Sequence, residues 1–423
     1  MLQRKYSLTK KYSVLFLSIC TAAILGACTP KHPKLEEIET KGTQPAVTAS
    51  TSGPSQNNGD SDKKSSKDIP TAETPDPIPA PDSKTPAAPA EETPDLAARF
   101  GEHCIAGQTF EVDLSEYGGK VYFVPFSPSE GQGFHMQIIQ DDKVLTDIPG
   151  YVPDKLSGEP FTSLDAVSFY DVNFDGNTDI MLIETYGSTS FAAVYYGFDA
   201  DAEDYGRNFT IQEQLSDNIT QQVPPLSVSQ IRILLSGGKR NGEFSDYKEA
   251  YRAVARLWKL AESDDDILCS LIYVDEDDIP ELAVGLNGYY TSLYTYNGGK
   301  VYTIMDHWSY GVMGNAGYEY SPRKNSIRNT NTDYAGAILY TTYLSVTPSH
   351  SLDTIAQIVF YNFDDVNKNG IPDEDEMGSM GMYGVSYLNG VEATNEQCAA
   401  YDAGGYEFIG GTMSLEALMS SLD

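Results

Sequence analysis

Short blocks of apolar residues recur from about residue 105 to the C-terminus, separated by glycine, proline, serine and acidic residues. Brief runs of apolar and β-branched residues between such turn formers are typical of strands. The blocks therefore predict a mostly β region between residues 105 and 225. The strands expected there are residues 121–124, 136–139, 166–170, 180–183 and 192–196.

The pattern changes to a helical one between residues 230 and 262. Residues 230–235 predict a short helix that Gly237 and Gly238 end. A longer helix is expected from an N-cap at Ser245 to about Glu262, because its apolar residues recur at steps of three and four. That spacing places its tyrosines and Trp258 on one buried face, where they serve as core rather than as a ligand platform.

Strand-like blocks return after residue 268. The expected strands are residues 270–274, 281–286, 292–296, 301–305 and 355–363, with turns at 297–299 and 389–390. Thr394 and Gln397 have the spacing of a capping box that opens a short helix ended by Gly404 and Gly405, and Ser414 is expected to cap a last helix through Leu422. The predicted fold class is α+β, β-rich, with two globular domains, 96–226 and 227–423, after a disordered tether.

The first 95 residues have a different pattern from the rest of the chain. Basic residues precede an apolar run that is too short for a comfortable membrane span, and small residues then lead into Cys28. The tetrapeptide Leu25-Gly26-Ala27-Cys28 resembles a bacterial lipobox. That resemblance implies a cleaved signal peptide over residues 1–27 and fatty acyl chains, such as palmitate, carried by Cys28 on the extracytoplasmic face of the cell membrane. Residues 28–95 are rich in proline, serine, threonine and charge and lack a packable apolar pattern, so they predict a disordered tether.

Charge and cysteine content narrow the function classes. The chain has 28 basic and 61 acidic residues, a net charge of −33. Such a surface repels nucleic-acid phosphates and attracts divalent cations, so no nucleic-acid partner is expected. Beyond Cys28 the expected mature chain has Cys104, Cys269 and Cys398, an odd number without a C-x-x-C pair, and buried free thiols are favoured over one disulfide.

The most specific motif is the twelve-residue segment 365–376. Oxygen-bearing side chains occupy positions 1, 3, 5, 9 and 12, glycine occupies position 6, and Ile371 can offer its carbonyl at position 7. This spacing resembles an EF-hand-type calcium loop and implies Ca²⁺ as the ligand. A strand-like run before it, a poor helix after it and Pro372 at position 8 place the loop outside a helix–loop–helix pair. The implied ligands are Asp365, Asn367, Asn369, Ile371, Asp373 and Glu376.

A second segment, residues 171–179, repeats positions 1, 3, 5, 6 and 9 of this pattern between two predicted strands. It resembles the loop of FG-GAP or VCBS-type repeats and implies a second calcium site; the alternative is an Asp/Asn-rich turn held by its own side chains. The implied ligands are Asp171, Asn173, Asp175, Asn177 and Asp179.

A third segment, residues 273–282, lacks the first acid and the glycine, and a solvated acidic turn is the favoured interpretation. With these turns and the lipobox, the chain resembles uncharacterised surface lipoproteins of Gram-positive anaerobes, a resemblance that implies location and calcium but no activity.

Catalytic motifs are missing from the sequence: it has no H-E-x-x-H, G-x-S-x-G, P-loop or strand-linked G-x-G-x-x-G. No catalytic residue is therefore assigned. The pattern favours a membrane-anchored, calcium-stabilised, non-enzymatic module that binds a wall, glycan or protein ligand. A secreted hydrolase that acts on glycans through a carboxylate pair is the alternative.

Overall fold

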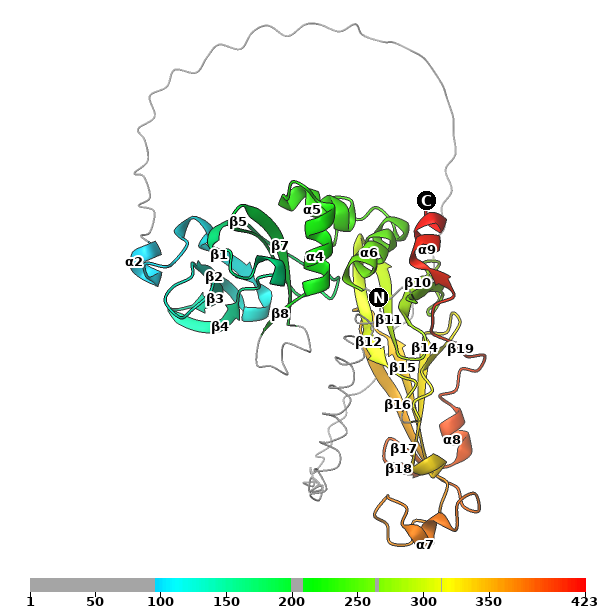
Figure 1. Ribbon diagram of the computed structural model, residues 1–423. Coiled ribbons are helices and arrows are strands. Elements are labelled where there is room, and N and C mark those ends of the chain that lie inside the picture. Colours follow the sequence, from blue (N-terminus) through cyan, green and yellow to red (C-terminus); the bar gives the residue numbers. More distant parts are fainter. Residues whose placement is uncertain (1–95, 199–207, 263–265, 313) are drawn as a thin grey trace, which may run out of the picture. The chain divides into compact units, whose positions relative to one another are not determined.

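The structure, a computed structural model, describes residues 96–198, 208–262, 266–312 and 314–423. The expected signal peptide, Cys28 and the expected tether, residues 1–95, lie outside the described residues. Within them the protein is α+β and β-rich, as the sequence predicted, and its strands form four antiparallel sheets (Figure 1).

The two N-terminal sheets have four strands each, in the orders β1-β2-β3-β4 and β5-β6-β7-β8. Their bounds are β1 Phe110–Leu114, β2 Gly119–Phe126, β3 His135–Gln140, β4 Lys143–Pro149, β5 Phe161–Tyr170, β6 Asp179–Tyr186, β7 Thr189–Gly197 and β8 Phe209–Ile211.

The third sheet has five strands in the order β12-β11-β10-β9-β20, and the fourth has seven in the order β18-β17-β16-β15-β14-β13-β19. Their bounds are β9 Leu268–Ile272, β10 Glu281–Leu286, β11 Tyr290–Asn297, β12 Lys300–Ser309, β13 Tyr318–Ser321, β14 Ser326–Asp333, β15 Ile338–Val346, β16 Leu352–Tyr361, β17 Val385–Leu388, β18 Val391–Ala393, β19 Glu407–Phe408 and β20 Met413–Ser414.

Helices connect and cover these sheets. The described α-helices are α2 Leu96–Phe100, α4 Glu213–Gln222, α5 Val228–Ser236, α6 Tyr247–Ala261, α7 Glu374–Met377, α8 Asn395–Ala399 and α9 Leu415–Ser421. Short 3-10 turns add η1 Ala106–Gln108, η2 Ser115–Tyr117, η3 Asp154–Leu156 and η4 Tyr334–Gly336.

The core is layered, and two of the sheets are buried on both faces. In β6, Ile180 and Leu182 pack against the β1–β4 sheet, whereas Met181 and Ile183 pack on the side of α4, α5 and α6. In β10, Leu282 and Val284 face the helices, and Ala283 belongs to the cluster shared with the seven-stranded sheet. Double burial explains why both strands are continuous apolar runs rather than alternating ones.

The helical layer joins residues from both sides of the expected domain boundary at 226/227. Its cluster includes Leu215 and Ile219 of α4, Tyr251 and Trp258 of α6, and Leu418 of α9. The described residues group into one compact unit by their contacts. The division into domains 96–226 and 227–423 therefore stays a prediction.

Several local predictions are confirmed. Helix α5 ends at Gly237 in a left-handed conformation, the aromatic stripe of α6 is core, and the capping box of Thr394 and Gln397 forms with both its hydrogen bonds. Ser414 caps α9. The cysteines Cys104, Cys269 and Cys398 are buried free thiols.

Two local predictions are wrong, and one helix was not predicted. Asp246, not Ser245, caps α6 by accepting a hydrogen bond from the Glu249 amide, while Ser245 donates to the Glu249 side chain. Helix α8 ends at Ala399, well before Gly404. The sequence analysis did not predict helix α4, because its polar sequence leaves only a narrow apolar stripe of Leu215 and Ile219. The rest of the region 105–225 is mostly β, as expected.

Candidate metal loops and a binding pocket

The predicted calcium loop 171–179 connects β5 to β6, so strands flank it on both sides as expected. Its side chains turn back onto its own backbone. The Asn173 side-chain oxygen accepts from the Asp175 amide at 3.3 Å, and a carboxylate oxygen of Asp175 accepts from the Asn177 amide at 2.7 Å. Gly176 has φ of +89°, the left-handed conformation that position 6 of such a loop requires.

Asp179, at position 9 of this loop, is fully buried. One of its carboxylate oxygens accepts from the Val172 amide at 2.6 Å and the other from the Gly197 amide at 2.9 Å. Burial raises the pKa of Asp179 well above its usual value in spite of these bonds. Its first role is therefore to close the loop and tie it to the end of β7.

Asp171, at position 1, is held from outside the loop. The Asn241 amide donates 2.8 Å to one carboxylate oxygen of Asp171 and 3.0 Å to the Val301 carbonyl, and it accepts from the Val301 amide. The other oxygen, Oδ1, is buried and accepts no hydrogen bond of normal geometry among the described residues, although the Phe174 and Gly176 amides lie close enough to Asp171 to oppose the rise of its pKa. Burial raises the pKa of Asp171 to about 6, against the opposing effect of Asn241. A buried carboxylate oxygen without a well-formed hydrogen bond is a group that a cation would satisfy.

The third segment, 273–281, has the same local structure between β9 and β10. The Asp275 carboxylate accepts from the Asp277 amide, and Asp277 accepts from the Ile279 amide at 2.8 Å. Glu281 takes the place of Asp179: it is buried and accepts from the Val274 amide at 2.8 Å and from the Thr295 hydroxyl. Burial raises the pKa of Glu281 to about 7.

This segment also holds the tightest acidic group. Among the described residues, Asp275, Asp277 and Glu281 alone form a set of three His, Cys, Asp or Glu side chains with ligand atoms all within 4.8 Å of one another. The sequence interpretation favoured a solvated turn here because the first acid and the glycine are missing. The D-x-D-x-x-x-E spacing was the sequence signal for this cluster. The burial of Glu281 depends on β11, and that spacing does not reveal it.

The predicted loop 365–376 follows β16 and runs into the first turn of α7, outside a helix–loop–helix pair as expected. Asp365 accepts from the Asn369 and Gly370 amides, and the Asn367 and Asn369 side chains each accept from the amide two residues on. Gly370 has φ of +74°.

Asp373 and Glu376 close this loop. They form a capping box at the start of α7, and Glu376, which is buried, also accepts from the Asn367 amide at 3.2 Å. Each of the three loops thus ends in a buried carboxylate that accepts backbone amides from its beginning. The carboxylates of Asp365, Asp373 and Glu376 do not form a three-member group within 4.8 Å, nor do those of Asp171, Asp175 and Asp179. Ile371 is half exposed, and its amide donates to the Asn369 side chain at 2.7 Å.

A pocket of about 630 Å³ lies beside the loop 171–179, which comes first of the three along the chain and is called the first loop below. Its walls come from that loop, from β12, and from β15, β16 and the turn that joins them. The side chains that give it chemical character are Asp171, Asp175, Asn241, Lys300, Tyr302, Trp308 and His350. No local pattern in the sequence indicates that Tyr302 and Trp308 lie beside the loop 171–179.

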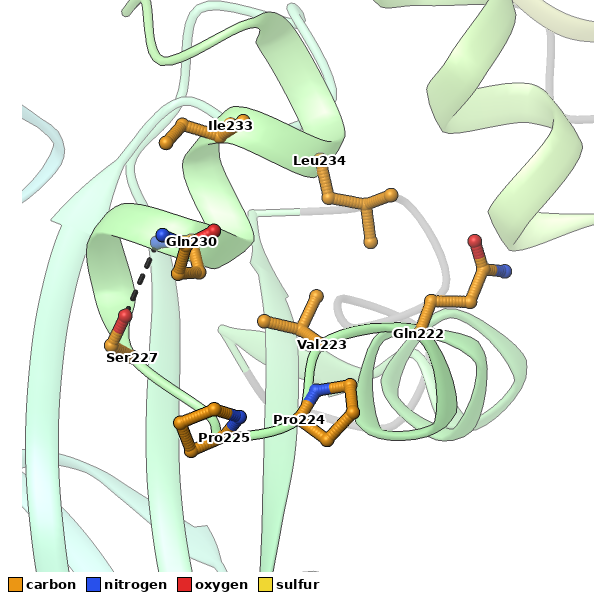
Figure 2. Close-up of a pocket in the computed structure, with 8 residues that line it drawn as sticks. All are labelled: Gln222, Val223, Pro224, Pro225, Ser227, Gln230, Ile233 and Leu234. Carbon is orange, nitrogen blue, oxygen red and sulfur yellow. Dashed lines mark hydrogen bonds between the residues drawn. The ribbon is translucent and has the colours of Figure 1, made fainter.

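A second pocket, of about 640 Å³, lies between the end of α4 and α5 (Figure 2). Its lining has no charged side chain, and its only drawn hydrogen bond, from the Gln230 amide to the Ser227 hydroxyl at 3.3 Å, is the N-cap of α5. Its polar groups therefore serve the helix rather than a ligand, and we do not treat it as a functional site.

Comparisons with protein-family models, with curated protein sequences and with solved structures return no match to this chain. In the described part of the chain, no helix is long and apolar enough to span a membrane.

Proposed function

We propose that this protein is a calcium-stabilised, non-enzymatic binding module, anchored by lipid on Cys28 to the extracytoplasmic face of a bacterial cell membrane. The single observation that carries the calcium part is Asp171, whose buried Oδ1 accepts no hydrogen bond of normal geometry from the described residues and lies beside a loop of further oxygen ligands. A divalent cation there would supply the missing positive charge.

Calcium would act as a clip between sheets. Asp171 is bonded through Asn241 to Val301 of β12, and the Thr303 hydroxyl donates to the Phe174 carbonyl at 2.8 Å. The loop between β5 and β6 is thereby tied to the edge of the five-stranded sheet. A cation that orders this loop would stabilise both sheets together, which is a structural role rather than that of a sensor.

A glycan hydrolase is the second candidate, favoured by two carboxylates, Asp171 and Asp175, at one pocket. Binding has the stronger support, because both oxygens of Asp175 already accept hydrogen bonds within the loop, and one oxygen of Asp171 accepts from Asn241. Turnover of a glycan that is lost in Asp175→Asn, with calcium binding retained, would favour the hydrolase.

Calcium binding is tested by calorimetric titration of CaCl₂ into the full chain in detergent. Only a few charged ligands serve each loop, so a dissociation constant of ~10⁻⁴–10⁻³ M is expected, as for extracellular modules. Saturating calcium should add roughly 1–3 kcal/mol to the free energy of unfolding. Asp171→Ala and Asp365→Ala should each remove one binding event, whereas Asp353→Ala, an exposed carboxylate on β16, should remove none. Absence of binding heat and of a melting shift with chelator would overturn the calcium assignment.

The anchor is tested separately. The full chain expressed in a bacterium should fractionate with membranes and carry acyl groups on Cys28 by mass spectrometry, and Cys28→Ser should release it in soluble form. Membrane fractionation that Cys28→Ser leaves unchanged would contradict the lipid anchor without bearing on calcium.

A further inference from the structure

The pocket beside the first loop contains two aromatic residues of one strand. Tyr302 and Trp308 both belong to β12, and both are half-buried. Tyr302 packs on His350 with ring centroids 4.3 Å apart, and Trp308 packs on Tyr318 at 5.4 Å. Because each ring is supported by a second ring, its orientation is set before a ligand arrives.

The same pocket offers unused hydrogen-bond donors. The Lys300 ammonium, the Tyr302 hydroxyl and the Trp308 indole N–H have no hydrogen-bond partner within the described residues. The side-chain amide of Asn297 hydrogen-bonds to Nε2 of His350 at 3.0 Å, which leaves Nδ1 of the ring available to a ligand. These donors come from β12 and from the turn between β15 and β16, so they approach the pocket from two walls.

The pocket also contains hydrogen-bond acceptors. The carboxylates of Asp171 and Asp175 line the pocket on the side of the first loop. The Thr303 hydroxyl donates to the Phe174 carbonyl and can still accept, and the Ser349 and Ser351 hydroxyls pair with each other and with Thr347. A ligand that fits must therefore present donors, acceptors and an apolar face together. Saccharide rings do so, because their hydroxyls donate and accept while their C–H faces pack on aromatic rings.

The charge of the protein limits the chemical class of the ligand further. Two carboxylates stand at the pocket against one lysine, and the whole chain has a net charge of −33. The net charge of −33 disfavours an anionic ligand even where a calcium ion neutralises the two carboxylates, and a purely apolar ligand would leave Lys300 without a partner. The volume of about 630 Å³ is within the range of small-ligand sites.

We propose that the pocket formed by Asp171, Lys300, Tyr302, Trp308 and His350 binds a neutral saccharide, with Tyr302 and Trp308 packing on the sugar face. This inference rests on the proposed binding function and names its site and ligand class. It assigns Trp308 to ligand contact, while the other tryptophan, Trp258, is buried in the core.

The two tryptophans, the complete set in this chain, provide the measurement. Titration of the full chain with neutral oligosaccharides, namely tetraoses of glucose, mannose and N-acetylglucosamine, should change the fluorescence of the wild-type protein through Trp308. At least one tetraose should saturate the signal. In Trp308→Phe the fluorescence change should be lost, because the remaining indole, that of Trp258, is buried in the core and does not line the pocket.

Affinity is then measured by calorimetry in variants. Tyr302→Ala and Lys300→Ala should each weaken saccharide binding by about tenfold, as expected for an aromatic anchor and a direct hydrogen-bond donor. Lys300 is exposed, so its substitution leaves the fold intact. Tyr289→Ala, which removes a tyrosine that is 64% exposed on the turn between β10 and β11, is the matched control and should bind normally.

No binding of any neutral tetraose would overturn the inference, as would binding that Lys300→Ala and Tyr302→Ala leave unchanged. Tighter binding of a uronic-acid oligosaccharide or of a peptide at this pocket would also overturn the neutral-saccharide class. Calcium titration of the same samples separates the two proposals: calcium heat without saccharide binding contradicts only this inference, whereas a missing calcium signal contradicts the calcium clip.

Discussion

The side-chain amide of Asn241 donates a 2.8 Å hydrogen bond to the carboxylate of Asp171, a residue seventy positions earlier in the chain. The same amide group pairs with both backbone groups of Val301, so one side chain connects the first loop to β12. Together with the hydrogen bond from the Thr303 hydroxyl to the Phe174 carbonyl, this contact ties the loop to β12.

Asn241→Ala should therefore destabilise the protein. It removes three hydrogen bonds, one of them to a carboxylate, and leaves Asp171 more deeply unsatisfied. We expect a loss of about 2–3 kcal/mol in the free energy of unfolding, measured by urea denaturation without calcium. Asn395→Ala, at an exposed position of α8, is the control and should change stability little. Equal midpoints for both variants would contradict the connecting role.

We expect Asp179 to stabilise the fold through its own hydrogen bonds, whereas we expect Asp171 to act mainly as a cation ligand. Asp179→Ala leaves the Val172 and Gly197 amides buried without partners, so we expect a loss of about 2–5 kcal/mol both with and without calcium. Asp171→Ala should instead reduce mainly the calcium-dependent part of the stability. Denaturation of each variant in calcium and in chelator measures the difference. A loss for Asp179→Ala that appeared only in calcium would show that the carboxylate acts through the ion.

Glu184 on β6 should make the protein less stable as pH rises. It is fully buried, and neither carboxylate oxygen makes a hydrogen bond of normal geometry among the described residues. Burial raises its pKa well above the ordinary 4.5, against the opposing effect of the nearby Tyr186 hydroxyl. The unfolded chain loses this proton near pH 4.5 while the folded chain keeps it, so stability falls as pH rises above that value.

Glu184→Gln cannot ionise and removes this dependence. Relative to wild type, the variant should gain stability between pH 4.5 and pH 8 in urea denaturation, and the difference should vanish below pH 4. Glu130→Gln, an exposed glutamate, is the control and should follow wild type at each pH. Parallel curves for Glu184→Gln and wild type would refute a buried, protonated Glu184.

His307 should add stability that is lost in alkali. Burial alone would lower its pKa, but hydrogen bonds and charge from Asp306 and Glu262 outweigh burial and raise the pKa to about 9. Asp306 lies 2.6 Å from Nδ1, and the ring stacks on Trp258 at 4.8 Å. A pKa above the unfolded value of 6.5 stabilises the fold fully below that pH, and this contribution disappears as pH rises through about 9.

The comparison of His307→Gln with wild type tests this effect by thermal unfolding from pH 6 to pH 10. Wild type should be the more stable protein at pH 6, and the two should converge near pH 10. The side chain of His307 is 46% exposed, so solvent screening keeps the effect small. His103→Gln, at an exposed histidine, should leave the pH profile unchanged. A constant offset across the range would mean that the ring acts through packing alone.

Much of the fold could be predicted because its signals are local. Strands β6 and β10 are continuous apolar runs, and the turn between β11 and β12 is marked by Asn297, Gly298 and Gly299. Strand β14, by contrast, is largely polar and rich in asparagine and threonine. Its backbone hydrogen bonds are made with the neighbouring strands β13 and β15. The sequence did not predict it, because its hydrogen bonds rather than its side chains place it in the sheet.

By itself the sequence determined the β-rich class and the loops at 171–179 and 365–376, since oxygen side chains at alternate positions with a glycine at the bend define a turn within a few residues. Tertiary structure alone decided the rest. Asn241 meets Asp171, Glu281 is buried beside Thr295, and Tyr302 and Trp308 line a pocket with the first loop. Such contacts join residues far apart in the chain, and they arise from the packing of layers, which no local spacing encodes.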